Sequence, residues 1–168
     1  MSAELSLTGA ENYFEDFEVG AVIEHYRGKT ITNLENVLIT NMVMNTAQGH
    51  FNEDRMSRSP WGKILSYGGV NFSMVLGLAS QDCCENAIQE LGLNNIRLTK
   101  SVHHGDTIYA YSEVLEKSDS DREDAGVVTF RHYGVNQNRE MVAQIDRKVL
   151  LKRRPAARRL SSHAPRAR

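Results

Sequence analysis

SYGGVNFSMVLGLASQDCCENAIQEL, residues 66–91, is the stretch of the chain that decides the fold. It opens with two glycines and is then apolar on almost every helical face through Ala79, a pattern typical of a helix buried on all sides. The apolar run within it, residues 70–79, is about half as long as a bilayer-spanning helix must be. We therefore expect a central helix inside a protein core and no membrane span.

The pattern changes after Gly92 to strands separated by short polar breaks. The expected strands cover roughly residues 95–101, 107–117, 126–136 and 141–153. Consecutive strands joined by short turns pair antiparallel. Together with one buried helix, they predict an α+β fold in which a curled antiparallel sheet wraps around the central helix.

The chain before residue 66 is more mixed. Residues 21–32 are rich in β-formers and predict a first strand, after which apolar residues at helical spacing predict a helix over residues 34–44. Residues 45–63 are polar and are broken by Gly49, Pro60 and Gly62, so we expect an excursion of loop or short helix there.

Length and charge predict one domain with a distinct tail. The 168 residues fit a single domain, and the net charge of −1 hides seven Lys or Arg residues and no acid from Lys152 to Arg168. Residues 154–168 are therefore expected to form a disordered basic tail. An inert tail is the simplest interpretation and implies no nucleic-acid partner, although binding to a nucleic acid or an anionic lipid remains an alternative.

The cysteines and the N-terminus predict where the protein resides. Cys83 and Cys84 are adjacent, and adjacent cysteines suit neither a disulfide framework nor a zinc site. The N-terminal residues are acidic and show no secretory pattern. These features predict a reduced, cytoplasmic protein that does not associate with membranes.

Motifs for phosphate, dinucleotide and zinc binding, and for serine-hydrolase nucleophiles, do not occur in the sequence. No two of the six histidines have a metal-ligand spacing on a helix. We therefore expect neither a metal nor a cofactor. The remaining candidate for chemistry is the polar segment NTAQGHFN, residues 45–52, followed by Gly68 and Gly69.

This segment resembles the signature of the MaoC-like, R-specific enoyl-CoA hydratases, which is Asp-x-x-x-x-His-x-Asp with a glycine 18 residues after the histidine. Asn45, His50, Asn52 and Gly68 occupy those positions without a gap. The opening NYFEDFEVG, residues 12–20, and HGDT, residues 104–107, are also similar to the family. The resemblance covers residues 12–153, leaves residues 1–11 as an arm, and is strongest to the mesaconyl-CoA hydratase branch.

The resemblance implies a hotdog fold and reversible hydration of a 2-enoyl thioester, most simply an acyl-CoA. It implies that His50 is the general acid and base, that Asn45 orients the water, and that the Gly68 N–H stabilises the thioester oxygen. Residues expected to line the substrate pocket are Asn52, Tyr67, Gly69 and Trp61. The resemblance also implies a homodimer, and Arg97, Lys100 and the tail arginines are weaker candidates for contacts with CoA phosphates.

Two departures from the family pattern leave alternatives open. Asn45 replaces the catalytic aspartate, and an amide cannot accept a proton, so either His50 is the sole base, or a carboxylate such as Glu53 or Asp54 takes part, or activity is lost. Leu76 replaces a serine that some relatives carry on the central helix. His50 could also be a loop histidine that caps backbone groups, and the glycines could serve close packing alone. The rival functions are a hotdog thioesterase and a protein that binds an acyl thioester with little catalysis.

Overall fold

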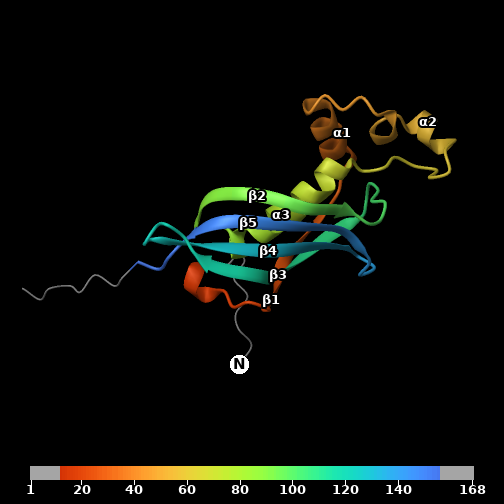
Figure 1. Ribbon diagram of the computed structural model, residues 1–168. Helices are drawn as coiled ribbons and strands as arrows, with labels where there is room; N and C mark the ends of the chain where they lie inside the picture. The colour runs from red at the N-terminus through yellow and green to blue at the C-terminus, as the bar shows by residue number, and fades with distance from the viewer. Residues whose placement is uncertain (1–11, 156–168) are drawn as a thin grey trace, which may run out of the picture.

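The computed structural model describes residues 12–155, so the predicted arm (residues 1–11) and residues 156–168 of the predicted tail lie outside the described residues. Five strands and three α-helices make up the fold (Figure 1). The strands are β1 Val22–Thr30, β2 Ala87–Leu98, β3 Thr107–Asp119, β4 Ala125–Asn136 and β5 Met141–Lys152. The helices are α1 Asn33–Met42, α2 Glu53–Ser57 and α3 Gly68–Cys83, with short 3-10 turns at Phe14–Asp16 and Gln48–His50.

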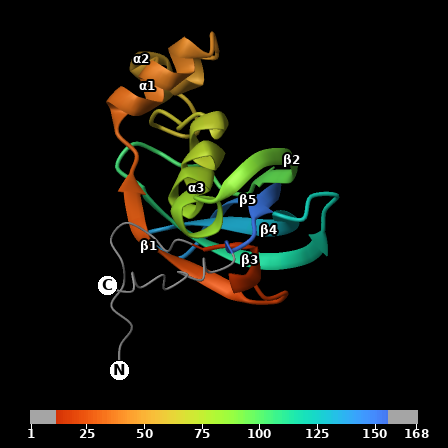
Figure 2. The same ribbon diagram turned by 90° about the vertical axis from the view of Figure 1, so that its left-hand side faces the viewer.

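The five strands form one antiparallel sheet in the order β1-β3-β4-β5-β2. The sheet curls around α3, which lies against its inner face (Figure 2). Alternate residues of β4 are buried, as expected for a strand with one face on the core. The core has two buried clusters, one around Phe130 and one around Val75 of α3. The predicted curled antiparallel sheet around a central helix is confirmed.

The start of β2 differs from the prediction. The strand was expected at about residues 95–101, but the central helix ends at Cys83 and β2 already begins at Ala87. Ala87 pairs with Leu151 and Glu90 with Val149 on β5, and Gly92 lies inside the strand at a register shift instead of ending an element. The extended conformation of residues 87–91 thus depends on hydrogen bonding to β5 and could not be inferred from the amino-acid pattern of the segment itself. Among residues 12–155, no helix is both long and apolar enough to cross a membrane.

The helix α1 and the excursion that follows it project beyond the end of the sheet, above the N-terminus of α3 (Figure 1). Thr32 caps α1 and Glu35 completes a capping box. The buried side chains of α1 are Asn36 and Thr40, both 0% exposed. Three of its apolar side chains face outward: the exposed fractions are 74% for Leu34, 52% for Leu38 and 73% for Met42.

Candidate active site

His50 ends the 3-10 turn Gln48–His50 and is half-buried. Its Nδ1 atom lies 3.0 Å from the carbonyl oxygen of Leu65. A carbonyl can only accept a hydrogen bond, so Nδ1 carries the hydrogen and Nε2 keeps the basic lone pair. Within residues 12–155, Nε2 has no hydrogen-bond partner. The contact with Leu65 therefore selects, for the neutral ring, the tautomer that a general base requires.

Tyr67 and the first glycines of α3 lie beside His50. The Tyr67 and His50 rings are 5.4 Å apart between centroids, and Tyr67 is the N-cap of α3. The first N–H groups of a helix have no partner inside the helix and lie at the positive end of its dipole. Gly68 and Gly69 supply two of these groups. A Cβ atom at Gly68 would overlap Leu98 of β2, and one at Gly69 would overlap the Tyr67 ring, so a larger residue at either position would force that side chain to move.

Asn36 is a buried residue of the site to which the sequence analysis gave no role. Its Nδ2 atom lies 2.9 Å from the carbonyl oxygen of His50 and 2.9 Å from Nε2 of His104, and its Oδ1 accepts a hydrogen bond from the Tyr67 N–H at 2.8 Å. It thereby links α1, the His50 turn, the HGDT turn and the start of α3. The only signal in the sequence was a polar residue among the apolar positions of a predicted helix, which did not point to these partners.

Burial lowers the pKa of His104, and the charge of His103 acts in the same direction, whereas Glu53 partly offsets both. His104 is therefore neutral at neutral pH. In that state its Nε2 can accept the hydrogen bond from Asn36. The HGDT turn that carries His104 owes its shape to Gly105, whose φ is +91°, and to Asp106, which accepts a hydrogen bond from the His103 N–H.

The two other asparagines of the motif have partners within their own loop. Asn45 Oδ1 accepts a hydrogen bond from the Ala47 N–H at 2.9 Å. Asn52 caps α2 by accepting from the Arg55 N–H, and its Nδ2 donates to Gln48. Within this described loop, neither side chain is hydrogen bonded to the His50 ring.

The remaining candidates are dispersed. Trp61 is exposed in a groove of about 710 Å³ on the surface of the excursion, which Gln48 and Gly49 also line. Leu76 is half-buried on α3 and packs against the cluster around Val75. Arg97 and Lys100 are exposed at the end of β2 and just beyond it, and Lys100 forms an ion pair with Glu140.

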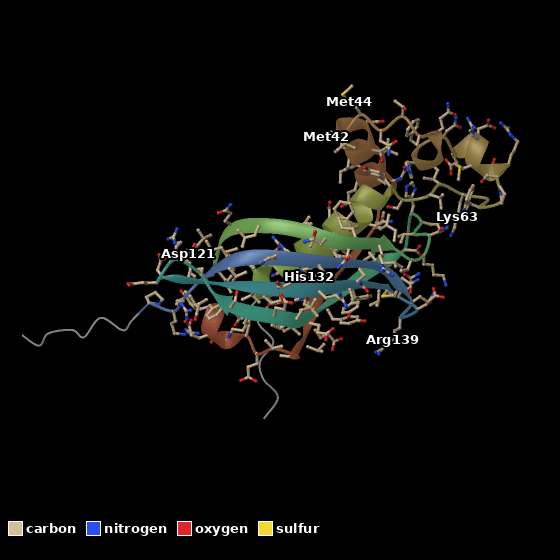
Figure 3. The ribbon with its side chains drawn as sticks, in the orientation of Figure 1. Met42, Met44, Lys63, Asp121, His132 and Arg139 are labelled. Atoms are coloured by element: carbon tan, nitrogen blue, oxygen red, sulfur yellow. The ribbon has the colours of Figure 1, made fainter. Side chains whose placement is uncertain are left out.

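A second polar cluster includes His132 (Figure 3) and reaches Asp82 and Cys83 at the C-terminal end of α3; it was not evident in the sequence. Ser112 Oγ lies 2.6 Å from Nε2 of His25 and 2.6 Å from Nδ1 of His132, and His25 Nδ1 lies 2.6 Å from a carboxylate oxygen of Asp82. With Cys83, the two histidines form the one group of three metal-ligand side chains found among residues 12–155. The Ser112 hydroxyl is hydrogen bonded to both rings, so the cluster is a buried hydrogen-bond network.

The family model described as mesaconyl-CoA hydratase matches residues 9–153. Mesaconyl-CoA hydratase of Haloarcula marismortui is 33% identical over 152 residues, which cover 84% of this chain and 42% of the relative. β-Methylmalyl-CoA dehydratase of Chloroflexus aurantiacus is 35% identical over 113 residues, or 67% of this chain and 32% of the relative. The chain thus spans less than half the length of these relatives.

Solved structures show the same fold. A MaoC domain protein dehydratase from Chloroflexus aurantiacus superposes with a TM-score of 0.80 at 30% identity, over 92% of this chain and 49% of that one. A Mycobacterium tuberculosis protein described as a double hotdog superposes with a TM-score of 0.78 at 18% identity, over 98% of this chain and 54% of that one. The predicted single hotdog fold is confirmed, and it corresponds to about half of these longer chains.

Proposed function

Because the chain belongs to the mesaconyl-CoA hydratase family of MaoC-like proteins, we propose that it interconverts 2-enoyl and 3-hydroxyacyl thioesters by adding and removing water. The observation that carries the proposal is the His50 imidazole, which is held by the Leu65 carbonyl with Nε2 available beside the N-terminus of α3. A base next to oriented N–H donors is the arrangement that this reaction needs.

In the proposed reaction, His50 Nε2 takes a proton from water while the water oxygen forms a bond to C3 of the enoyl group. The C2=C3 electron pair moves toward the carbonyl, which becomes an enolate oxygen. The imidazolium then returns the proton to C2 as the thioester carbonyl re-forms. The sum is the addition of one water molecule, and the reverse sequence is dehydration. The proposal requires no metal and no redox cofactor.

The N-terminus of α3 is the proposed site for the developing negative charge. The Gly68 N–H would donate to the enolate oxygen, and the helix dipole adds to this interaction. The side chains of Leu98 and Tyr67 pack directly against Gly68 and Gly69, so these two residues border the proposed position of the enolate oxygen. Tyr67, packed against His50, is the substrate-lining residue that the geometry supports best.

Asn45 sets how the water is activated. Its Oδ1 accepts from the Ala47 N–H but retains a second lone pair, and its Nδ2 is a donor. The amide can therefore orient a water molecule without deprotonating it. In the proposed mechanism His50 is the sole base, where the family pattern has both a histidine and an aspartate.

Coenzyme A is the proposed carrier, and a small methyl-branched dicarboxylic acid is the proposed acyl group. The support is that the relatives are described as acting on mesaconyl-CoA and β-methylmalyl-CoA, both of which carry such a group. An acyl carrier protein is the alternative carrier.

A second copy of this chain is the proposed partner. Leu34, Leu38 and Met42 form an outward apolar face on α1, the helix that contacts the turn carrying His50. An exposed apolar patch of this kind marks an interface. The Mycobacterium tuberculosis protein with the same fold is described as a double hotdog, which supports a second hotdog unit beside this one.

The test is turnover of crotonyl-CoA and mesaconyl-CoA, followed through the loss of the enoyl thioester absorbance. We expect His50→Ala to lower kcat on the order of 10²- to 10⁴-fold, because the general base is lost. Arg58→Ala is the control, since Arg58 is exposed at the end of α2, where it forms an ion pair with Asp54, and should leave turnover nearly unchanged.

Other outcomes would redirect the proposal. Release of free CoA thiol from a saturated acyl-CoA would indicate a thioesterase. Tight binding of both thioesters without turnover would indicate a binding protein. The replacement of the family's aspartate by Asn45, which cannot act as a base, is the reason to consider this function. Equal turnover by the wild type and His50→Ala would contradict the role of His50.

A further inference from the structure

Four segments of the site meet at one buried side chain, Asn36. We propose that Asn36 is the positioning residue that fixes His50, His104 and the start of α3 relative to one another. The expected effect of Asn36 on catalysis rests on the proposed function. The hydrogen bonds that Asn36 makes do not depend on any activity.

The orientation of the Asn36 amide follows from one contact. The backbone N–H of Tyr67 can only donate, and it lies 2.8 Å from the side-chain atom that must therefore be Oδ1. The other terminal atom is Nδ2, a donor. It faces the carbonyl oxygen of His50 at 2.9 Å and that of Leu65 at 3.5 Å, both of which can only accept.

The same amide determines the tautomer of His104. Nδ2 of Asn36 donates, so Nε2 of His104 at 2.9 Å must accept, and the hydrogen of the neutral ring lies on Nδ1. Protonation of His104 would put a hydrogen on Nε2, which would then face the Nδ2 hydrogen of Asn36, so that two donors would oppose each other. Burial and the charge of His103 keep the ring neutral, against the opposing influence of Glu53.

Asn36 thereby holds both functional parts of the site. It binds the main chain of His50 and approaches the Leu65 carbonyl, which fixes the ring through Nδ1. It also binds the N–H of Tyr67, one residue before the proposed oxyanion donor Gly68. A base and an oxyanion donor that come from separate segments need such a link, because displacements of about 1 Å can cost on the order of 100-fold in rate.

Asn36→Asp tests the proposal, because aspartate keeps the shape and the acceptor for Tyr67 but cannot donate to His50 or His104. We expect kcat to fall about 10- to 100-fold with KM changed less than about threefold, since orientation is lost and not a substrate contact. We also expect the pKa of His104 to rise, because the carboxylate favours the imidazolium. Asn86→Asp, the same change at another buried asparagine near the far end of α3, is the control.

The second measurement is ¹⁵N NMR of the histidine rings in the wild-type protein, which needs neither activity nor a folded variant. We expect Nδ1–H tautomers for both His50 and His104, and a lowered pKa for His104. An Nε2–H tautomer of His104, or Asn36→Asp with unchanged kcat and an unchanged His104 titration, would overturn the proposal. Absence of turnover in the wild type would sink the proposed function alone, and the NMR result would still decide the role of Asn36.

Discussion

At the scale of single residues, His132 shows how burial controls protonation. It is completely buried on β4, its Nδ1 is hydrogen bonded to Ser112, and its Nε2 has no partner within residues 12–155. Burial, together with the nearby charges of Arg147 and His25, lowers its pKa from 6.5 to about 3. The folded protein therefore excludes a proton that the unfolded chain binds.

This exclusion predicts a pH-dependent stability. At pH values above 6.5 His132 is neutral in both states and carries no penalty. As the pH falls from 6.5 toward 3, the unfolded state gains a proton and the folded state does not, so stability is lost. We expect the free energy of unfolding of the wild type to fall by up to about 1.4 kcal/mol per pH unit more steeply than that of His132→Asn.

Urea unfolding of the two proteins at a series of pH values from 7.5 downward measures the difference. Because groups distant from His132 titrate alike in both proteins, the difference between the two profiles reports on His132 and the cluster around it, whatever the absolute stabilities are. Parallel pH profiles would show that His132 does not resist protonation in the fold.

At the scale of elements, α3 carries glycines with different surroundings. Gly68, at the N-terminus, has Leu98 of β2 where a Cβ would be, whereas Gly77, in the middle of the helix, has no atom within 4 Å of that position. Gly68→Ala should lower turnover about tenfold or more, because the methyl group forces Leu98 to move beside the oxyanion donor. The double variant Gly68→Ala/Leu98→Ala should recover part of the loss, since the obstructing side chain is then gone.

Gly77→Ala serves as the control on the same helix. It should raise the free energy of unfolding by about 0.5–1 kcal/mol, because alanine is the better helix former, and should leave turnover unchanged. Steady-state kinetics and thermal unfolding of the three variants provide both readouts. Failure of the Leu98 change to restore any activity would contradict the steric explanation.

At the scale of the whole molecule, α1 buries two polar side chains and exposes three large apolar ones. Asn36 and Thr40 face the core, and Leu34, Leu38 and Met42 face outward. A lone hotdog unit would leave this surface in water next to the His50 turn, which is why we propose a second copy as its cover.

Leu38→Glu should therefore shift the protein from dimer to monomer, because a carboxylate would have to be buried in the interface. Turnover should fall with it if the interface supports the His50 turn. Light scattering after size-exclusion chromatography measures the mass. Val19→Glu, which makes the same change at another exposed apolar residue, should leave the mass unaltered. A monomeric wild type would refute the homodimer.

Much of the architecture could be predicted because it depends on local periodicity. The apolar run after Gly68 predicts α3, and the alternation and short turns after residue 106 predict β3, β4 and β5 to within a few residues. The motif spacing likewise pointed to His50, Gly68 and the family. The catalytic roles of His50, Asn45 and Gly68 and the pocket roles of Asn52, Tyr67, Gly69 and Trp61 remain predictions.

The sequence by itself therefore determined which segments are buried and which short motifs could act together, because periodicity and spacing are properties of a single segment. Only the tertiary structure decided that residues 87–91 pair with β5, that the apolar face of α1 points outward, and that Asn36 joins His50, His104 and Tyr67. Each of these depends on contacts between segments distant in the chain. A hydrogen bond between distant segments imposes no repeating pattern of residues on either segment, so it cannot be predicted from the sequence of one of them.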